Sequence, residues 1–249
     1  LMNKLAKFSF NEYRKILELY SPICKDFKDI DSTTTDFCLI RHDVEFSLER
    51  ALEIAKIDSS YGIKSSFFIQ VLNDAYNPLS SVNSDLIKKI EEYGHFVGLH
   101  FYFSHLEEGN LKNLEDELKR QVNILQGCLK AKIDRFSYHR PSHWALEIDT
   151  YQFSNLINAY SQPYFEFVSE GTPKKVKYIA DSNHTWKYGH PLETNNYKCF
   201  QLLIHPDEWS ETGGSELENF KSIIEDANIK FINNVNLEYK TFEAIKKFF

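Results

Sequence analysis

Residues 39–47 read LIRHDVEFS, and this stretch decides how the rest of the chain is interpreted. The apolar run at 37–40 predicts a buried strand, and it gives way to four titratable side chains: Arg41, His42, Asp43 and Glu45. Apolar residues at helical spacing follow over 47–60, and Gly62 lies just past their end, as is common at a helix terminus. A strand that ends in polar groups and leads into a helix is typical of a β/α fold.

The same alternation of strand and helix continues along most of the chain. Further strands are expected at 65–71, 96–101, 135–140, 165–170, 176–181 and 199–205, and further helices at 10–20, 84–94, 113–129, 149–160, 215–228 and 241–249. The pattern predicts an α/β protein with a single domain, a distorted (β/α)7-type barrel with an extra N-terminal helix. The competing architecture is a doubly wound open sheet. We expect residues 1–36 to form that helix and a lead-in loop packed on the core, and 37–249 to form the barrel.

Composition narrows the possible partners. The 249 residues carry a formal net charge of -7 and contain no block of Lys and Arg, which argues against a nucleic-acid-binding surface. The four cysteines are far apart and form no C-x-x-C pair, so a cysteine zinc site is not expected. No apolar run is long enough for a membrane span or a signal peptide, and we therefore expect a cytoplasmic protein.

Polar side chains gather where the predicted strands end. In β/α folds the carboxyl ends of the strands face one common site, so residues that are distant in sequence should converge there. Imidazole and carboxylate groups together suit Zn²⁺ or another borderline divalent metal. The side chains at these strand ends are Arg41, His42, Asp43, Gln70, His100, His139, Arg140, Asp181 and His205.

The order of these pieces resembles the polysaccharide deacetylase (NodB-homology) superfamily, in the branch whose first motif reads H-D-V-D. The resemblance covers roughly residues 37–209, most of the chain. It implies a divalent-metal-dependent hydrolase, with Zn²⁺ as the expected ion, that removes an N-acyl group, in the first place acetyl, from an amino sugar. Such an enzyme would act on a linear amide in surface-polysaccharide metabolism.

The resemblance also assigns metal ligands and acid–base groups. It implies that Asp43 and His100 bind the metal, and that His105 supplies the third ligand although the family spacing falls on Ser104. His205 corresponds to the general acid. The identity of the base stays open, because His42 stands in its usual place and Glu45 corresponds to the second acid of the branch. Glu45 could instead be a charge at the start of the helix near 47.

Further residues are expected around the reaction centre. By the resemblance, Arg140 orients the base, and Glu45 is its expected partner. Leu203 would line the acyl pocket. The expected substrate-binding side chains include His139, Asp181, Trp186 and Trp209, although core packing is an equally good interpretation of the tryptophans.

The expected substrate is a nucleotide-sugar, a lipid-linked precursor or an oligosaccharide that contains an amino sugar. Two other functions are compatible with the same residues. Because Ser104 stands where the family has a histidine ligand, and His42 stands where it has the base, the protein could instead bind a glycan or a nucleotide-sugar without hydrolysis. An amidase or deformylase on the same scaffold would use the same chemistry. A β/α protein whose histidines serve only local hydrogen bonds is the alternative without a site. The oligomeric state is not indicated.

Overall fold

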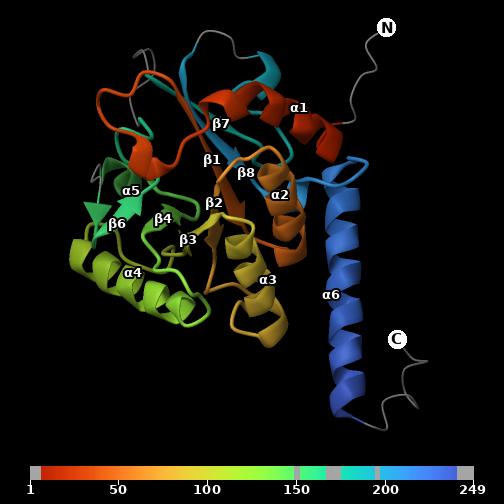
Figure 1. Cartoon of the computed structure of the whole chain (residues 1–249). Coiled ribbons are helices and arrows are strands. Elements are labelled where there is room, and N and C mark those ends of the chain that lie inside the picture. The colour runs from red at the N-terminus through yellow and green to blue at the C-terminus, as the bar shows by residue number, and fades with distance from the viewer. Residues whose placement is uncertain (1–6, 149–151, 167–174, 194–196, 240–249) are drawn as a thin grey trace, which may run out of the picture.

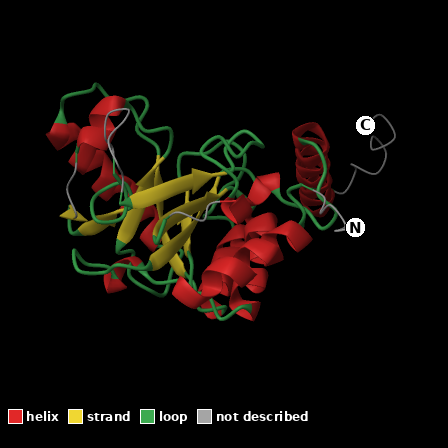
Figure 2. Cartoon of the chain, turned by 90° about the horizontal axis from the view of Figure 1, so that it is seen from above, coloured by secondary structure: helices red, strands yellow, loops and turns green. Residues whose placement is uncertain are grey.

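A computed structural model describes residues 7–148, 152–166, 175–193 and 197–239. Eight strands form one sheet in the order β5-β6-β4-β3-β2-β1-β8-β7, and all neighbours are parallel except β5 and β6. The strands are β1 (Phe37–Val44), β2 (Ser66–Ile69), β3 (Phe96–Phe101), β4 (Arg135–Tyr138), β5 (Gln152–Phe153), β6 (Leu156–Asn158), β7 (Val176–Ala180) and β8 (Cys199–Ile204). Figure 2 shows the sheet curling between layers of helices, and the predicted distorted (β/α)7-type barrel is confirmed.

Helices follow most of the parallel strands and cover the outside of the sheet (Figure 1). A Ser or Asn side chain accepts a hydrogen bond from the first turn of each, which satisfies a backbone donor that the helix itself cannot. The helices are α1 (Phe10–Tyr20), α2 (Leu48–Ser60), α3 (Ser81–Glu92), α4 (Leu111–Gln126), α5 (His143–Glu147) and α6 (Glu216–Glu238). In α1, Tyr13, Ile16 and Leu17 are buried in the main hydrophobic core.

The central strand β1 is longer than expected. The sequence predicted a strand over 37–40, but β1 continues to Val44, so Arg41, His42 and Asp43 lie inside the strand. Alternate side chains of a strand point to opposite faces. Arg41 and Asp43 therefore face the barrel interior, whereas His42 faces outward, toward Asp58 of α2.

Side chains bridge the gap between the two edges of the sheet. Within the described ranges β7 pairs with β8 alone, so no ladder joins it to β5 or β6. Instead, Gln201 on β8 donates a hydrogen bond of 2.8 Å to the carbonyl of Ala159. Arg41 on β1 donates one of 2.6 Å to the hydroxyl of Tyr160. The segment that follows β6 thus fills the barrel interior below the strand ends.

The helix predicted over 149–160 is wrong in its described part. Residues 152–158 form a tight antiparallel hairpin, in which Gln152 pairs with Ile157 and Phe153 with Leu156. Ser154 and Asn155 turn the chain with φ angles of 55° and 62°, in the left-handed region that a helix cannot contain. Of the two strands, β6 is buried throughout, whereas Phe153 of β5 is half-buried.

The observed boundaries of two helices also differ from the predicted ones. Helix α3 begins three residues before the expected position, because Ser80 rather than Ser84 caps it. Helix α6 continues well past 228 to Glu238 and projects from the body of the molecule (Figure 1). The helix expected at 241–249, and much of the strand expected at 165–170, fall outside the described residues. In the part of the chain that is described, no helix has the length and apolarity that a bilayer crossing requires.

Candidate active site

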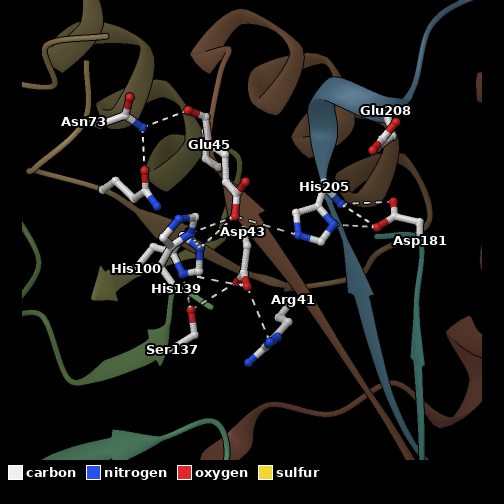
Figure 3. Close-up of polar contacts among 12 residues, drawn as sticks. Arg41, Asp43, Glu45, Asn73, His100, Ser137, His139, Asp181, His205 and Glu208 are labelled. Carbon is white, nitrogen blue, oxygen red and sulfur yellow. Dashed lines mark hydrogen bonds and ion pairs between the residues drawn. The ribbon is translucent and has the colours of Figure 1, made fainter. Parts of the chain in front are cut away.

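Three ligand-type atoms meet just beyond the end of β1. The Oε1 atom of Glu45 lies 3.2 Å from Nε2 of His100 and 2.9 Å from Nδ1 of His139. The same two ring nitrogens lie 3.2 Å from each other. Figure 3 shows both imidazoles on one side of Glu45 and His205 on the other. We call Glu45, His100 and His139 the ligand cluster.

Strand register explains why these residues meet. His100 is on β3 and pairs in register with Ser137 on β4, so His139, two residues further on, projects from the same edge of the sheet. Glu45 follows β1 directly, and parallel strands present their carboxyl ends at one edge. The Glu45 side chain is 17% exposed to solvent, so solvent reaches the ligand cluster.

The ligand cluster fits a divalent metal by its donor set. Two imidazoles and one carboxylate are a common catalytic zinc combination that leaves a coordination position open. Tetrahedral ligands at 2.0–2.1 Å from zinc lie about 3.3 Å apart, which is close to the separations of the three atoms. Three acceptor-capable atoms this close repel one another unless a cation or protons lie between them.

The charge on Glu45 is strongly stabilised. Burial alone would raise its pKa, but the hydrogen-bonding contacts with the rings of His100 and His139 and the positive charges nearby outweigh burial and hold the pKa well below its usual range. The carboxylate is therefore ionised at neutral pH. An anionic oxygen between two imidazoles is what a cation at this place requires.

His205 lies at the end of β8, on the far side of Glu45. Its Nδ1 is 2.7 Å from Oδ1 of Asp181, and its Nε2 is 4.0 Å from Oε1 of Glu45. Trp209 donates a hydrogen bond of 2.7 Å from Nε1 to Asp181 and so fixes the carboxylate. Burial opposes the charged imidazole, but Asp181 and Glu45 raise the pKa of His205 to about 10. His205 is thus a protonated imidazole whose Nε2 faces the cluster.

Asp43 lies beneath the ligand cluster and is 2% exposed. Its Oδ1 accepts a hydrogen bond of 3.1 Å from the hydroxyl of Ser137, and its Oδ2 lies 3.4 Å from Nη2 of Arg41. The nearest ring nitrogen of His100 is Nδ1, at 3.7 Å, on the side of the ring away from the cluster. Asp43 therefore contacts the site from behind, and it is not among the three clustered ligand atoms.

Two of the expected site histidines lie elsewhere. The structure places His105 half exposed beside α4, with Nε2 3.9 Å from Glu117, and outside the ligand cluster. His42 is completely buried on the outer face of β1, where its Nε2 is 2.7 Å from Asp58. His139, expected to bind substrate, takes the place in the cluster that was expected for His105.

The remaining expected residues surround the site in different ways. Arg140 is exposed and has a φ of 48°, and no ion pair with Glu45 is present in the described structure. Trp209 is fully buried, and the half-buried Trp186 packs 6.1 Å from it between ring centroids. Leu203 is buried on β8, two residues before His205.

Sequence reasoning missed Ser137 and Asp207, and it assigned no role to Arg41. Ser137 is in the middle of a predicted strand, where a small polar residue gives no signal of its own. Asp207 lies two residues after His205, and burial raises its pKa to about 7, with Glu45 and Glu208 adding to the effect. Arg41 was visible as a charge at a strand end, but its direction depends on the strand continuing to Val44.

No family model and no curated protein matches the chain. Among solved structures, a CE4 family pseudoenzyme from Bacillus anthracis is 13% identical with a TM-score of 0.47, over 80% of this chain and 63% of that one. A CE4 esterase from Streptococcus mutans is 11% identical with a TM-score of 0.49, over 87% and 90%. A chitin deacetylase from the fungal pathogen Colletotrichum lindemuthianum is 15% identical with a TM-score of 0.43, over 78% and 84%.

The chain spans less than two thirds of the length of the pseudoenzyme structures that it matches, between 63% and 65%. The solved structures to which this chain is similar thus include CE4 family pseudoenzymes, a CE4 esterase and a chitin deacetylase.

Proposed function

We propose that this protein is a metal-dependent hydrolase that removes an N-acyl group, in the first place acetyl, from an amino sugar. The observation that carries the proposal is the ligand cluster of Glu45, His100 and His139, with a protonated imidazole, His205, on the far side of Glu45. A cation site next to a proton donor is the arrangement that amide hydrolysis needs, because an amine leaves only after it receives a proton.

The metal would be held by Glu45, His100 and His139, and Zn²⁺ is the ion that two imidazoles and a carboxylate favour. This set differs from the expected Asp43, His100 and His105 in two members. When bound, such an ion polarises an amide carbonyl and lowers the pKa of a coordinated water to about 7. Two histidines and one carboxylate leave room for that water and for the substrate.

His205 is the proposed general acid. Asp181 accepts a hydrogen bond of 2.7 Å from Nδ1–H, so the second proton of the imidazolium is on Nε2 and points toward Glu45. The backbone N–H of His205 also donates to Asp181, at 3.0 Å, which holds the ring in one orientation. A positioned acid of this kind contributes roughly 10²–10⁴-fold to the rate.

The proposed substrate is a nucleotide-sugar, a lipid-linked precursor or an oligosaccharide with an N-acylated amino sugar, met in the cytoplasm. The half-buried ring of Tyr102 stacks on His139 with centroids 5.3 Å apart and extends the site with an aromatic surface. Arg140 follows His139 in the chain, is exposed and has no ion pair in the described structure, so it is available to a phosphate group of a nucleotide-sugar. Leu203 is retained as the proposed acyl-pocket residue.

A binder without hydrolysis is a second candidate, and one observation favours it. Both carboxylates near the end of β1 are already engaged: Asp43 with Ser137 and Arg41, and Glu45 with His100 and His139. Neither is left free to accept the proton of an attacking water. A binding protein would keep the metal and the sugar but release no acid.

Product analysis tests the proposal. The protein is loaded with Zn²⁺ and incubated with UDP-N-acetylglucosamine, N-acetylglucosamine oligomers and the corresponding N-formyl sugars, and released acetate and formate are measured. We expect acetate release that is lost on chelation and on His205→Ala. Binding of metal and sugar without acid release would establish the binder instead, and preferential formate release would indicate a deformylase. A chain that binds no metal would refute the proposal.

A further inference from the structure

A continuous line of buried polar contacts runs beneath the ligand cluster. His100 Nδ1 is 2.8 Å from the hydroxyl of Ser137, and that hydroxyl is 3.1 Å from Oδ1 of Asp43. Asp43 Oδ2 lies 3.4 Å from Nη2 of Arg41, which donates to Tyr160 at 2.6 Å. His100, Ser137, Asp43 and Arg41 are each at most 2% exposed. Figure 3 shows the line passing from His100 through Ser137 to Asp43 and Arg41.

Between His100 and Asp43 the line contains one hydroxyl proton, that of Ser137, and its position can be deduced. A carboxylate only accepts hydrogen bonds, and the Arg41 guanidinium beside Asp43 supplies its counter-charge. The Ser137 hydroxyl must therefore donate its single proton to Asp43. Its oxygen then accepts from the other neighbour, which is Nδ1 of His100.

This assignment determines the tautomer of His100. With the proton on Nδ1, a neutral ring has a lone pair on Nε2, the nitrogen that lies 3.2 Å from Glu45 and 3.2 Å from His139. The opposite arrangement would have Ser137 donate to His100, and would leave Oδ1 of Asp43 facing a hydroxyl lone pair in a place closed to water. Such an unpaired buried acceptor is costly.

We propose that Ser137 and Asp43 are positioning residues that hold the proton of His100 on Nδ1 and so present its Nε2 lone pair to a metal in the ligand cluster. The inference rests on the proposed function for the identity of the ligand cluster. Asp43 acts through Ser137, on the far side of the ring, and does not touch the metal. Partners of this kind orient a ligating histidine and raise its basicity, and their loss typically costs about 10–100-fold in metal affinity.

The test compares two serine-to-alanine variants. Ser137→Ala removes the central hydroxyl of the line. Ser66→Ala is the matched control, because Ser66 is also buried on a barrel strand and its hydroxyl accepts a 2.8 Å hydrogen bond from Arg135, away from the ligand cluster. Ser137→Thr keeps the hydroxyl and serves as the rescue variant. The ring-nitrogen NMR signals of His100, assigned with His100→Gln, report its tautomer in the metal-free full chain.

In the wild-type and in Ser137→Thr we expect the Nδ1–H tautomer at alkaline pH, and in Ser137→Ala a mixture of both tautomers. Co²⁺ titrations followed by visible absorption should show about 10–100-fold weaker binding for Ser137→Ala and unchanged binding for Ser66→Ala. An Nε2–H tautomer in the wild-type protein overturns the proposal without any variant. Equal Co²⁺ affinity of wild-type and Ser137→Ala also overturns it.

The two readouts separate this inference from the proposed function. If the tautomer is Nδ1–H but the wild-type protein binds no Co²⁺, the proton assignment is correct and the metal-dependent function is wrong, so the claim of a metal-presenting role falls with it. If Co²⁺ binds but the tautomer is Nε2–H in the metal-free chain, the function stands and the positioning role of Ser137 is refuted.

Discussion

Replacing single histidines tests which residues belong to the proposed metal site. His139→Ala deletes a ring nitrogen that lies 2.9 Å from Glu45 and 3.2 Å from His100. Structural zinc sites with four ligands bind with about 10–16 kcal/mol, or about 2.5–4 kcal/mol for each ligand. Loss of one ligand should therefore weaken Zn²⁺ binding by roughly 10²–10³-fold. Competition with a chromophoric chelator measures the dissociation constant directly.

His105→Ala is the matched control, because it is the same substitution at the histidine that the family resemblance had assigned as the third ligand. His105 is half exposed and lies 3.9 Å from Glu117, outside the ligand cluster. We expect its replacement to leave the Zn²⁺ dissociation constant unchanged. If His105→Ala abolishes binding while His139→Ala does not, the ligand set derived from the structure is wrong, and with it the assignment of Glu45 as a ligand.

Three further changes test other parts of the structure. Asp181→Asn removes the carboxylate that raises the pKa of His205 to about 10. Because protonated His205 is lost as the pH rises through that pKa, the alkaline limb of the pH–rate profile should move to lower pH in this variant. An unmoved limb would rule out His205 as the acid. Asp58→Ala breaks a fully buried ion pair and should lower the free energy of unfolding by about 3–5 kcal/mol in denaturant melts. The pKa of Asp58 lies below its usual range. In the wild-type protein its contribution to the free energy of unfolding is therefore present above the unfolded-state pKa of Asp58 and is lost as the pH falls through the folded-state pKa. A denaturation midpoint that does not change with acid would contradict the ion pair. Gly98→Ala would place a Cβ 2.8 Å from the backbone oxygen of Arg135 and should cost about 1–3 kcal/mol, whereas an unchanged melting temperature would show that β3 and β4 can separate there.

The sequence predicted the barrel and the edge at which the site lies. Alternating elements indicate a parallel sheet, and polar groups at the strand ends mark its functional edge, which is why Glu45, His100 and His205 do converge. Local spacing could not predict which second histidine joins them. His105 is nearer to His100 along the chain, but the register of β3 with β4 brings His139 closer in space.

Side-chain direction was the second thing that the sequence left open. A strand thought to end at Ile40 gives no direction to the residues after it, so His42 and Asp43 were both expected at the site. Because β1 continues to Val44, His42 and Asp43 are neighbours within a strand and their side chains point to opposite faces of the sheet. The error at 149–160 has another cause, because Ser154 and Asn155 turn the chain with left-handed φ angles, which divide this segment into two short strands.

The two faces of β1 show why one strand carries so many charges. β1 lies between β2 and β8 and is buried along its whole length, so a polar side chain on either face needs a partner. On the inner face Asp43 contacts both Arg41 and Ser137 below the ligand cluster. On the outer face His42 meets Asp58 of α2, which also accepts hydrogen bonds from Tyr13 and Ser65.

This outer network has a consequence for the site. A shift of β1 by one residue would exchange its faces, placing Asp43 among apolar side chains and His42 under the ligand cluster. The contact of 2.7 Å between His42 and Asp58 opposes that shift, because breaking it would leave a buried charge without a partner. His42 therefore supports the position of Glu45 from the other side of the strand, and its replacement should reduce stability first and metal affinity only as β1 loosens.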